Sequence, residues 1–172
     1  MEHRPAQAAD LGRIMDIVAE AQSFLKQNRV SQWQNGYPGR DIFMKDIEEG
    51  NCHVFTVKGR IAGVICLSLG SEPAYDVVYG GNWLSPEPYA VFHRSAVSRE
   101  YRGKGIASQM LSYMEKIAKE KRFFSMRADT HRDNIAMRSV LEKNSYIHCG
   151  TVYLDGPACE IERVCYQKIF ED

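Results

Sequence analysis

The spacing of apolar residues along the chain predicts helices separated by strands. Residues 8–27 carry apolar side chains three or four positions apart, as one face of an amphipathic helix does. The members of that stripe are Leu11, Ile14, Met15, Val18, Ala21 and Leu25. The same period recurs in 104–121, and shorter helices are predicted over 41–49 and over 133–144, where Asp133 suits the N-cap.

Short apolar runs between the helices predict strands. The segment 52–69 is interpreted as two strands joined at Lys58-Gly59, which suits a tight hairpin turn. Further strands are predicted over 89–97, 123–129, 146–154 and 159–170, with a turn at Asp155-Gly156-Pro157. Because a helix separates 89–97 from 123–129, these two strands are expected to be parallel. The order of elements predicts a mixed α/β sheet flanked by helices, in one domain over 1–172.

Composition and charge exclude several classes of protein. The 172 residues include 22 Lys plus Arg and 22 Asp plus Glu, so no basic field suggests a nucleic-acid partner. No apolar run reaches the roughly 20 residues of a membrane-spanning helix, and "MEHRPAQAADL" lacks the apolar core of a signal peptide. We therefore expect a cytoplasmic protein without membrane association. The five cysteines form no C-x-x-C pair, so free thiols in the core are favoured over a metal site.

The stretch "SREYRGKGIASQML", residues 98–111, places the sequence RGKG of 102–105 between an apolar strand and an amphipathic helix. A helix N-terminus presents unpaired N–H groups and the positive end of a dipole. Glycines allow a phosphate to approach the backbone, and Arg and Lys add charge, so a pyrophosphate site is predicted. A strand–helix junction also needs glycine simply to turn. The P-loop pattern is absent, and Ser108 stands where the Rossmann pattern needs its last glycine.

Several parts of the chain resemble the GNAT family of N-acetyltransferases. "RGKGIA", residues 102–107, resembles the family's Q/R-x-x-G-x-G/A acetyl-CoA signature. "HRSAVSREY" is similar to the strand before that signature, "THRDNIAMRSVLEKNSYIHCG" to a later helix and strand, and "HRPAQAADLGRIMDIV" to the opening strand and helix. The resemblance implies an acyl-CoA N-acyltransferase fold, in which two central strands splay apart around the cosubstrate, and it implies no metal.

The resemblance also implies a reaction: a primary amine, on a small molecule or on a protein or peptide, attacks acetyl-CoA directly in a ternary complex. It implies that the pantetheine arm pairs with the end of strand 89–97 and that the Val97 N–H donates to the thioester carbonyl. The residues that it implies for acetyl-CoA binding are Ala96, Val97, Arg102, Gly103, Lys104, Gly105, Ile106, Ala107, Ser108, Asn134 and Met137. Asn134 also suits a helix cap, and both roles stay open.

His93 is the predicted general base. Strand alternation places it on the same face as Val97, and an imidazole with a pKa of roughly 6.5 is suited to accept a proton. A buried, hydrogen-bonded histidine is the alternative interpretation. Glu20 and Glu87 are further possible bases.

The predicted general acid is missing. The resemblance implies a tyrosine seven residues after Asn134, but Leu141 stands there and cannot donate a proton. The thiolate then leaves unassisted or through water, or Tyr146 or Tyr153 supplies the proton.

Aromatic residues gather in two loops, 30–40 and 70–88, which the resemblance places around the acceptor entrance. The predicted acceptor-binding residues are Trp33, Tyr37, Tyr79 and Trp83. Aromatic loops that only close the ends of the domain are the alternative.

Two other functions stay open. A non-catalytic acyl-CoA-binding or sensing module would keep the fold without the acid at Leu141. A phosphate-dependent enzyme such as a small kinase is disfavoured by the missing P-loop. The apolar alternation in 159–170 permits a homodimer.

Overall fold

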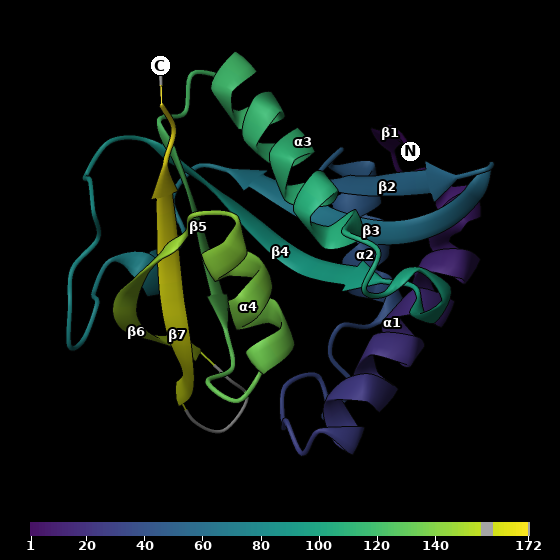
Figure 1. Ribbon diagram of the computed structural model, residues 1–172, viewed down its shortest axis with the longest axis horizontal. Helices are drawn as coiled ribbons and strands as arrows, with labels where there is room; N and C mark the ends of the chain where they lie inside the picture. The colour runs from purple at the N-terminus through teal and green to yellow at the C-terminus, as the bar shows by residue number, and fades with distance from the viewer. Residues whose placement is uncertain (156–159, 172) are drawn as a thin grey trace. The chain divides into compact units, whose positions relative to one another are not determined.

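A computed structural model describes residues 1–155 and 160–171 (Figure 1). The strands are β1 (Glu2–Pro5), β2 (Cys52–Val57), β3 (Arg60–Leu69), β4 (Tyr89–Val97), β5 (Ser125–Thr130), β6 (Ile147–Asp155) and β7 (Glu160–Ile169). The helices are α1 (Leu11–Gln27), α2 (Arg40–Glu48), α3 (Ile106–Glu120) and α4 (Ile135–Lys143), with short 3-10 helices η1 (Ala8–Asp10), η2 (Pro73–Tyr75) and η3 (Arg99–Tyr101). The strands follow the order β1-β2-β3-β4-β5-β7-β6 in a mixed sheet. The chain divides into two compact units, residues 1–68 with 92–112, and residues 69–91 with 113–172.

In the first unit, β1, β2 and β3 form an antiparallel ladder with a packed face. The predicted hairpin is confirmed, because Val57 pairs with Arg60 and the turn residues Lys58 and Gly59 have φ values of 50° and 74°. A two-residue hairpin turn of type I′ needs a positive φ at both of its central residues. One face packs against α1 and α2, and its core is Ala6, Leu11, Ile14, Ile17, Val18, Phe43, Cys52, Val54, Val64, Cys66 and Ala96.

The start of α3 packs on the opposite face of β3. Gly63 precedes the core-facing Val64, so it points away from α1 and α2. A Cβ atom at Gly63 would lie 2.5 Å from the Sδ atom of Met110, which is fully buried. Glycine therefore lets the first turns of α3 approach β3 closely. The loop between β4 and α3 therefore leads into a helix whose start is packed tightly on the sheet.

In the second unit, β7 lies between β5 and β6 and pairs with both. The first residues of β4 pair in parallel with β5, from Tyr89 with Ser125 to Val91 with Arg127, which confirms the predicted crossover. Because β7 is paired along both edges, its apolar alternation is that of an interior strand. The alternation in 159–170 therefore no longer supports a dimer.

The segment around Tyr79 is fixed on β6 by close backbone packing. Tyr79 and Thr151 exchange two backbone hydrogen bonds of 2.8 and 2.9 Å. Gly150 has a φ of 136°, and a Cβ atom there would lie 2.6 Å from the carbonyl oxygen of Tyr79. The loop 70–88 is therefore anchored at this point, with the Tyr79 ring edge-on to Tyr153 at 5.1 Å.

Several predicted element boundaries shift by a few residues, and two of these shifts have a clear physical reason. The helix predicted over 133–144 begins at Ile135, and its N-cap is Asn134 and not Asp133, because the Asn134 side chain accepts the Met137 N–H. The strand predicted over 123–129 begins at Ser125, while the N–H of Phe124 donates to the Pro88 carbonyl. The turn predicted at Asp155-Gly156-Pro157 lies largely outside the described residues. The single domain over 1–172 stays a prediction.

Acid is expected to destabilise the fold through His53. This histidine is buried in β2, with its Nδ1 atom 3.0 Å from Nε2 of His3. Burial, and then the neighbouring His3, lowers the pKa of His53 from 6.5 to about 4. Above pH 6.5 the ring is neutral in both states. As the pH falls from 6.5 to 4, only the unfolded chain gains the proton, so the free energy of unfolding falls by up to about 3 kcal/mol.

Urea unfolding of the wild type and His53→Gln at pH 7.5, 6, 5 and 4.5 measures this effect. We expect the variant to lose less stability than the wild type over the series. Parallel losses in the two proteins would show that His53 does not contribute.

Candidate functional site

At the end of β4, the backbone amide of Val97 is directed away from the neighbouring strand β3. The N–H of Ser98 donates to the Ala62 carbonyl of β3 at 2.8 Å. Successive N–H groups of a strand point to opposite edges, so the N–H of Val97 points away from β3. This is the amide for which the sequence predicts a hydrogen bond to the thioester carbonyl.

The predicted anion-binding loop follows directly. Gly103 and Gly105 have φ values of 74° and 75°, in the left-handed region that favours glycine. A Cβ atom at either glycine would have no atom within 4 Å, so the backbone is open to a ligand on that side. α3 begins at Ile106, and the first amides of a helix have no partner within the helix. Residues 102–108 are therefore gathered around the positive end of the α3 dipole.

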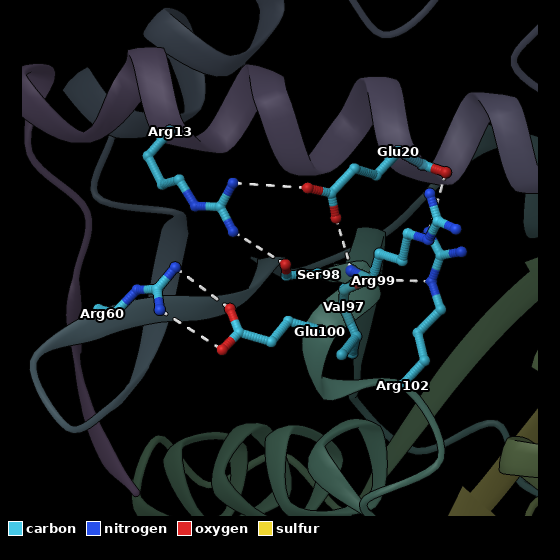
Figure 2. A network of polar contacts seen from close by, with 8 residues as sticks. All are labelled: Arg13, Glu20, Arg60, Val97, Ser98, Arg99, Glu100 and Arg102. Atoms are coloured by element: carbon cyan, nitrogen blue, oxygen red, sulfur yellow. Dashed lines mark hydrogen bonds and ion pairs between the residues drawn. The ribbon is translucent and has the colours of Figure 1, made fainter.

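The side chain of Arg102 is held by α1. Its Nη2 atom donates to the Glu20 carbonyl oxygen at 2.9 Å, and its guanidinium lies 4.8 Å from the centre of the Phe24 ring. Its Nε atom donates to the Val97 carbonyl at 3.4 Å (Figure 2). The exposed Lys104, whose Nζ atom lies 5.4 Å from the Tyr101 ring centre, is the more accessible cation of the loop.

Glu20, considered above as a base, is a structural anchor of the same loop. Its carboxylate accepts the Arg99 N–H at 2.5 Å and pairs with Arg13 at 3.5 Å, while Arg13 donates to the Ser98 hydroxyl at 2.8 Å (Figure 2). Burial raises the pKa of Glu20, but hydrogen bonds from Arg99, Ser98 and Arg13 outweigh it, and the net pKa is lowered. A carboxylate so occupied is a poor base.

His93 is half-buried and lies beside a strong ion pair. Arg94 donates through Nε and Nη2 to both oxygens of Asp46 in α2, at 2.7 and 2.8 Å, and through Nη1 to the Tyr37 hydroxyl at 3.0 Å. Burial, and then the charge of Arg94, lowers the pKa of His93 to about 4. The expectation of an unshifted imidazole is therefore wrong.

The backbone of Arg94 also changes the argument for His93. Arg94 has a φ of 48° in the middle of β4, a left-handed conformation that is uncommon for a side chain of this size. Such a residue interrupts the regular alternation of a strand. Alternation consequently cannot place His93 and Val97 on one face, contrary to the prediction from the sequence.

In the second unit, Asn134 caps α4. Its Oδ1 atom accepts the Met137 N–H and its Nδ2 atom donates to the Thr130 hydroxyl, both at 3.2 Å. The capping role is thus confirmed, and the role of Asn134 and Met137 toward acetyl-CoA stays a prediction.

Of the two candidate acids, Tyr146 is engaged within the protein, and a role for Tyr153 stays a prediction. Leu141 is fully buried, and the hydroxyl of Tyr146 donates to Glu115 at 3.1 Å. Burial, and then Glu115, raises the pKa of Tyr146 well above its ordinary value. The Tyr146 hydroxyl therefore offers no accessible proton.

The predicted acceptor residues fall in both units. In the first, Trp33 packs against the α1–α2 core, and Tyr37 is 39% exposed with its hydroxyl on Arg94. In the second, Tyr79 is exposed, and the Trp83 indole donates to the Tyr75 carbonyl at 2.8 Å. Trp33 and Trp83 therefore have packing roles, whereas Tyr37 and Tyr79 present accessible rings.

Three further features of the described residues concern metal sites, membrane-spanning helices and free thiols. In residues 1–155 and 160–171, no cluster of three or more His, Cys, Asp or Glu side chains is placed to hold a metal ion. Within the same ranges, no helix is long and apolar enough to cross a membrane. Cys52, Cys66, Cys149 and Cys165 are buried free thiols.

Known proteins resemble this chain in sequence and structure. The profile of the acetyltransferase (GNAT) family matches residues 17–146. The uncharacterised N-acetyltransferase YesJ of Bacillus subtilis is 25% identical over 148 residues, which are 85% of this chain and 81% of YesJ. A GNAT-family acetyltransferase from Streptococcus agalactiae is 34% identical, with a TM-score of 0.89 over 99% of this chain and 96% of that one. The PaiA N-acetyltransferase of Thermoplasma acidophilum, solved with coenzyme A, shares the fold at 18% identity, with a TM-score of 0.72 over 98% of each chain.

Proposed function

Because the chain belongs to the GNAT family of acetyltransferases, we propose that residues 1–172 act as one domain that transfers an acetyl group from acetyl-CoA to a primary amine by direct attack. The observation that carries this proposal is the loop 102–105. Its two glycines at positive φ join the end of β4 to the N-terminus of α3. Such a loop suits the pyrophosphate of coenzyme A, because backbone amides and a helix dipole both favour an anion.

The residues present fit the cosubstrate. The first-turn amides of α3 and the loop residues from Gly103 to Ala107 would bind the pyrophosphate, with Lys104 adding charge. The Val97 amide, directed away from β3, would donate to the thioester carbonyl as negative charge develops there. Ala96 and Val97 would offer backbone groups to the pantetheine arm. Asn134 and Met137 in the second unit are proposed as further contacts.

The acceptor amine must lose a proton to react. An alkyl ammonium has a pKa of about 10.4, so about one molecule in a thousand is neutral at pH 7. His93 is neutral throughout the physiological range because its pKa is about 4, so it can accept a hydrogen bond from the amine. Its imidazolium is too acidic to retain the proton, which would pass on to water. Trp33, Tyr37, Tyr79 and Trp83 are proposed as acceptor contacts, and of these Tyr37 and Tyr79 present exposed rings.

The leaving thiolate needs little assistance. A thiol has a pKa of roughly 8.5, so the anion is stable enough near neutral pH to depart without a dedicated acid. The burial of Leu141 and the engaged hydroxyl of Tyr146 are compatible with such a departure.

The glycine loop 102–105 also favours a second candidate function, an acyl-CoA-binding module without catalysis. Release of CoA from acetyl-CoA with pooled small amines, pooled peptides and no acceptor separates the two. Release that depends on one pool supports the acetyltransferase. Thermal stabilisation by acetyl-CoA without release in any pool supports the module, and a protein-only blank corrects for the cysteines.

Replacing His93 with glutamine is expected to lower kcat by at most about a hundredfold, the lower end of the range for a general base, because a pKa of about 4 makes His93 a weak proton acceptor. Since its pKa is about 4, His93 should cause no inflection between pH 6 and 7. The alkaline rise of kcat/KM should reflect the acceptor amine and persist in the variant. We would measure kcat/KM from pH 5.5 to 9.5 in both proteins. An inflection near pH 6.5 that disappears in His93→Gln would contradict the low pKa assigned to His93.

A further inference from the structure

Arg13 and Glu20, two turns apart on one face of α1, contact Ser98 and Arg99, the two residues that follow β4. The carboxylate of Glu20 accepts the Arg99 N–H at 2.5 Å and pairs with Arg13 at 3.5 Å. Arg13 in turn donates to the hydroxyl of Ser98, which is 1% exposed. Figure 2 shows Arg13 and Glu20 projecting from the same helix toward these two loop residues.

The same face of α1 also holds Arg102, the residue that precedes the first glycine of the loop. The carbonyl oxygen of Glu20 accepts from Arg102 at 2.9 Å, and the Arg102 guanidinium stacks on Phe24 at 4.8 Å. Its Nε atom also contacts the Val97 carbonyl at 3.4 Å. The side chain and the backbone of one residue, Glu20, therefore contact the loop at Arg99 and at Arg102.

This arrangement matters because the loop itself is intrinsically flexible. The loop contains Gly103 and Gly105. Glycine has access to more backbone conformations than any other residue type, so ordering the loop when a ligand binds costs conformational entropy. A loop that is already ordered on its strand side loses less entropy when an anion binds. Glu100 makes a weaker contact, since its partner is Arg60 of the β-hairpin and both side chains of that pair are exposed.

We propose that Glu20 is a positioning residue: from α1 it preorders residues 98–102, which lead into the loop 102–105, for the diphosphate of acetyl-CoA. The inference rests on the proposed function, because it assigns that loop to the cosubstrate. Glu20 does not touch the reacting atoms, so its effect should fall on cosubstrate affinity and leave the chemical step unchanged.

Calorimetric titration with acetyl-CoA and with inorganic pyrophosphate tests the inference on Glu20→Ala, Glu20→Gln and Glu100→Gln. Glu20→Ala should raise the Kd of both probes by about tenfold, the effect of one lost hydrogen bond to a charged group. Glu20→Gln retains an oxygen for the Arg99 N–H and should lose only about threefold. Glu100→Gln also removes one negative charge, from a residue next to Arg99 that does not contact α1 through its side chain in any described pair, and should leave both Kd values unchanged. Unfolding curves without ligand establish that each variant is folded.

Steady-state kinetics and amide exchange give independent readouts. In Glu20→Ala, the KM for acetyl-CoA should rise while kcat and the acceptor KM stay unchanged, and the Arg99 amide should exchange faster. A folded Glu20→Ala protein that binds both probes like the wild type would overturn the inference alone. A wild-type protein that binds neither probe would overturn the inference together with the proposed function.

Discussion

Replacing Gly105 with valine is expected to reduce acetyl-CoA affinity by at least about a hundredfold, because two unfavourable terms add. Gly105 has a φ of 75°, where a side chain costs about 1–2 kcal/mol per residue. The open space next to its Cα, where a Cβ atom would have no neighbour within 4 Å, is also the side from which a phosphate approaches the loop. A branched side chain would therefore strain the loop and occupy the approach. Calorimetric titration with acetyl-CoA measures the loss.

The matched control is Gly50→Val. Gly50 follows α2, has a φ of 74°, and a Cβ atom there would likewise have no neighbour within 4 Å. The two variants should lose similar thermal stability, and only Gly105→Val should lose affinity. Equal affinities in the two variants would remove the loop from the cosubstrate site.

Replacing Asp46 with alanine is expected to lower the free energy of unfolding by about 3 kcal/mol, the loss typical when one partner of a buried ion pair is removed. The side chains of Asp46 and Arg94 are only 9% and 15% exposed, and both carboxylate oxygens accept from the guanidinium. The variant would leave a positive charge without its partner, on a residue whose backbone is already strained. Urea unfolding at pH 7 measures the change.

A double-mutant cycle with Asp46→Leu and Arg94→Met isolates the pair. The double variant should be more stable than the sum of the single losses predicts, by about 1–3 kcal/mol, because two apolar side chains leave no buried charge. The exposed pair Lys45–Glu49 on the same helix is the control, and Lys45→Ala should cost less than about 0.5 kcal/mol. Strictly additive losses would mean that the ion pair has no coupling energy.

The elements of the fold could be predicted because their signals are local. The apolar stripe of α1, the hairpin at Lys58-Gly59 and the bounds of β4 all follow from spacing and turn chemistry within a few residues. The glycine loop is similarly local, since positive φ and helix start are encoded by adjacent residues. These features needed no knowledge of distant contacts.

The electrostatics of the site could not be predicted in this way. The pKa of His93 depends on burial and on Arg94, whose own position depends on Asp46, 48 residues earlier. No local pattern indicates that Arg94 adopts a left-handed conformation within a strand. The anchoring role of Glu20 depends on Arg99, 79 residues later. Only the folded chain brings these charges together.

The long separation in sequence between α1 and residues 98–102 also affects how the protein folds. The contacts from Arg13 to Ser98 and from Glu20 to Arg102 close chain segments of 85 and 82 residues. Closing such long segments is entropically costly and occurs after local helices and hairpins have formed. The anion-binding loop should consequently mature late in refolding. Recovery of pyrophosphate binding would then lag behind recovery of helical circular dichroism, and would report the arrival of α1 against β4.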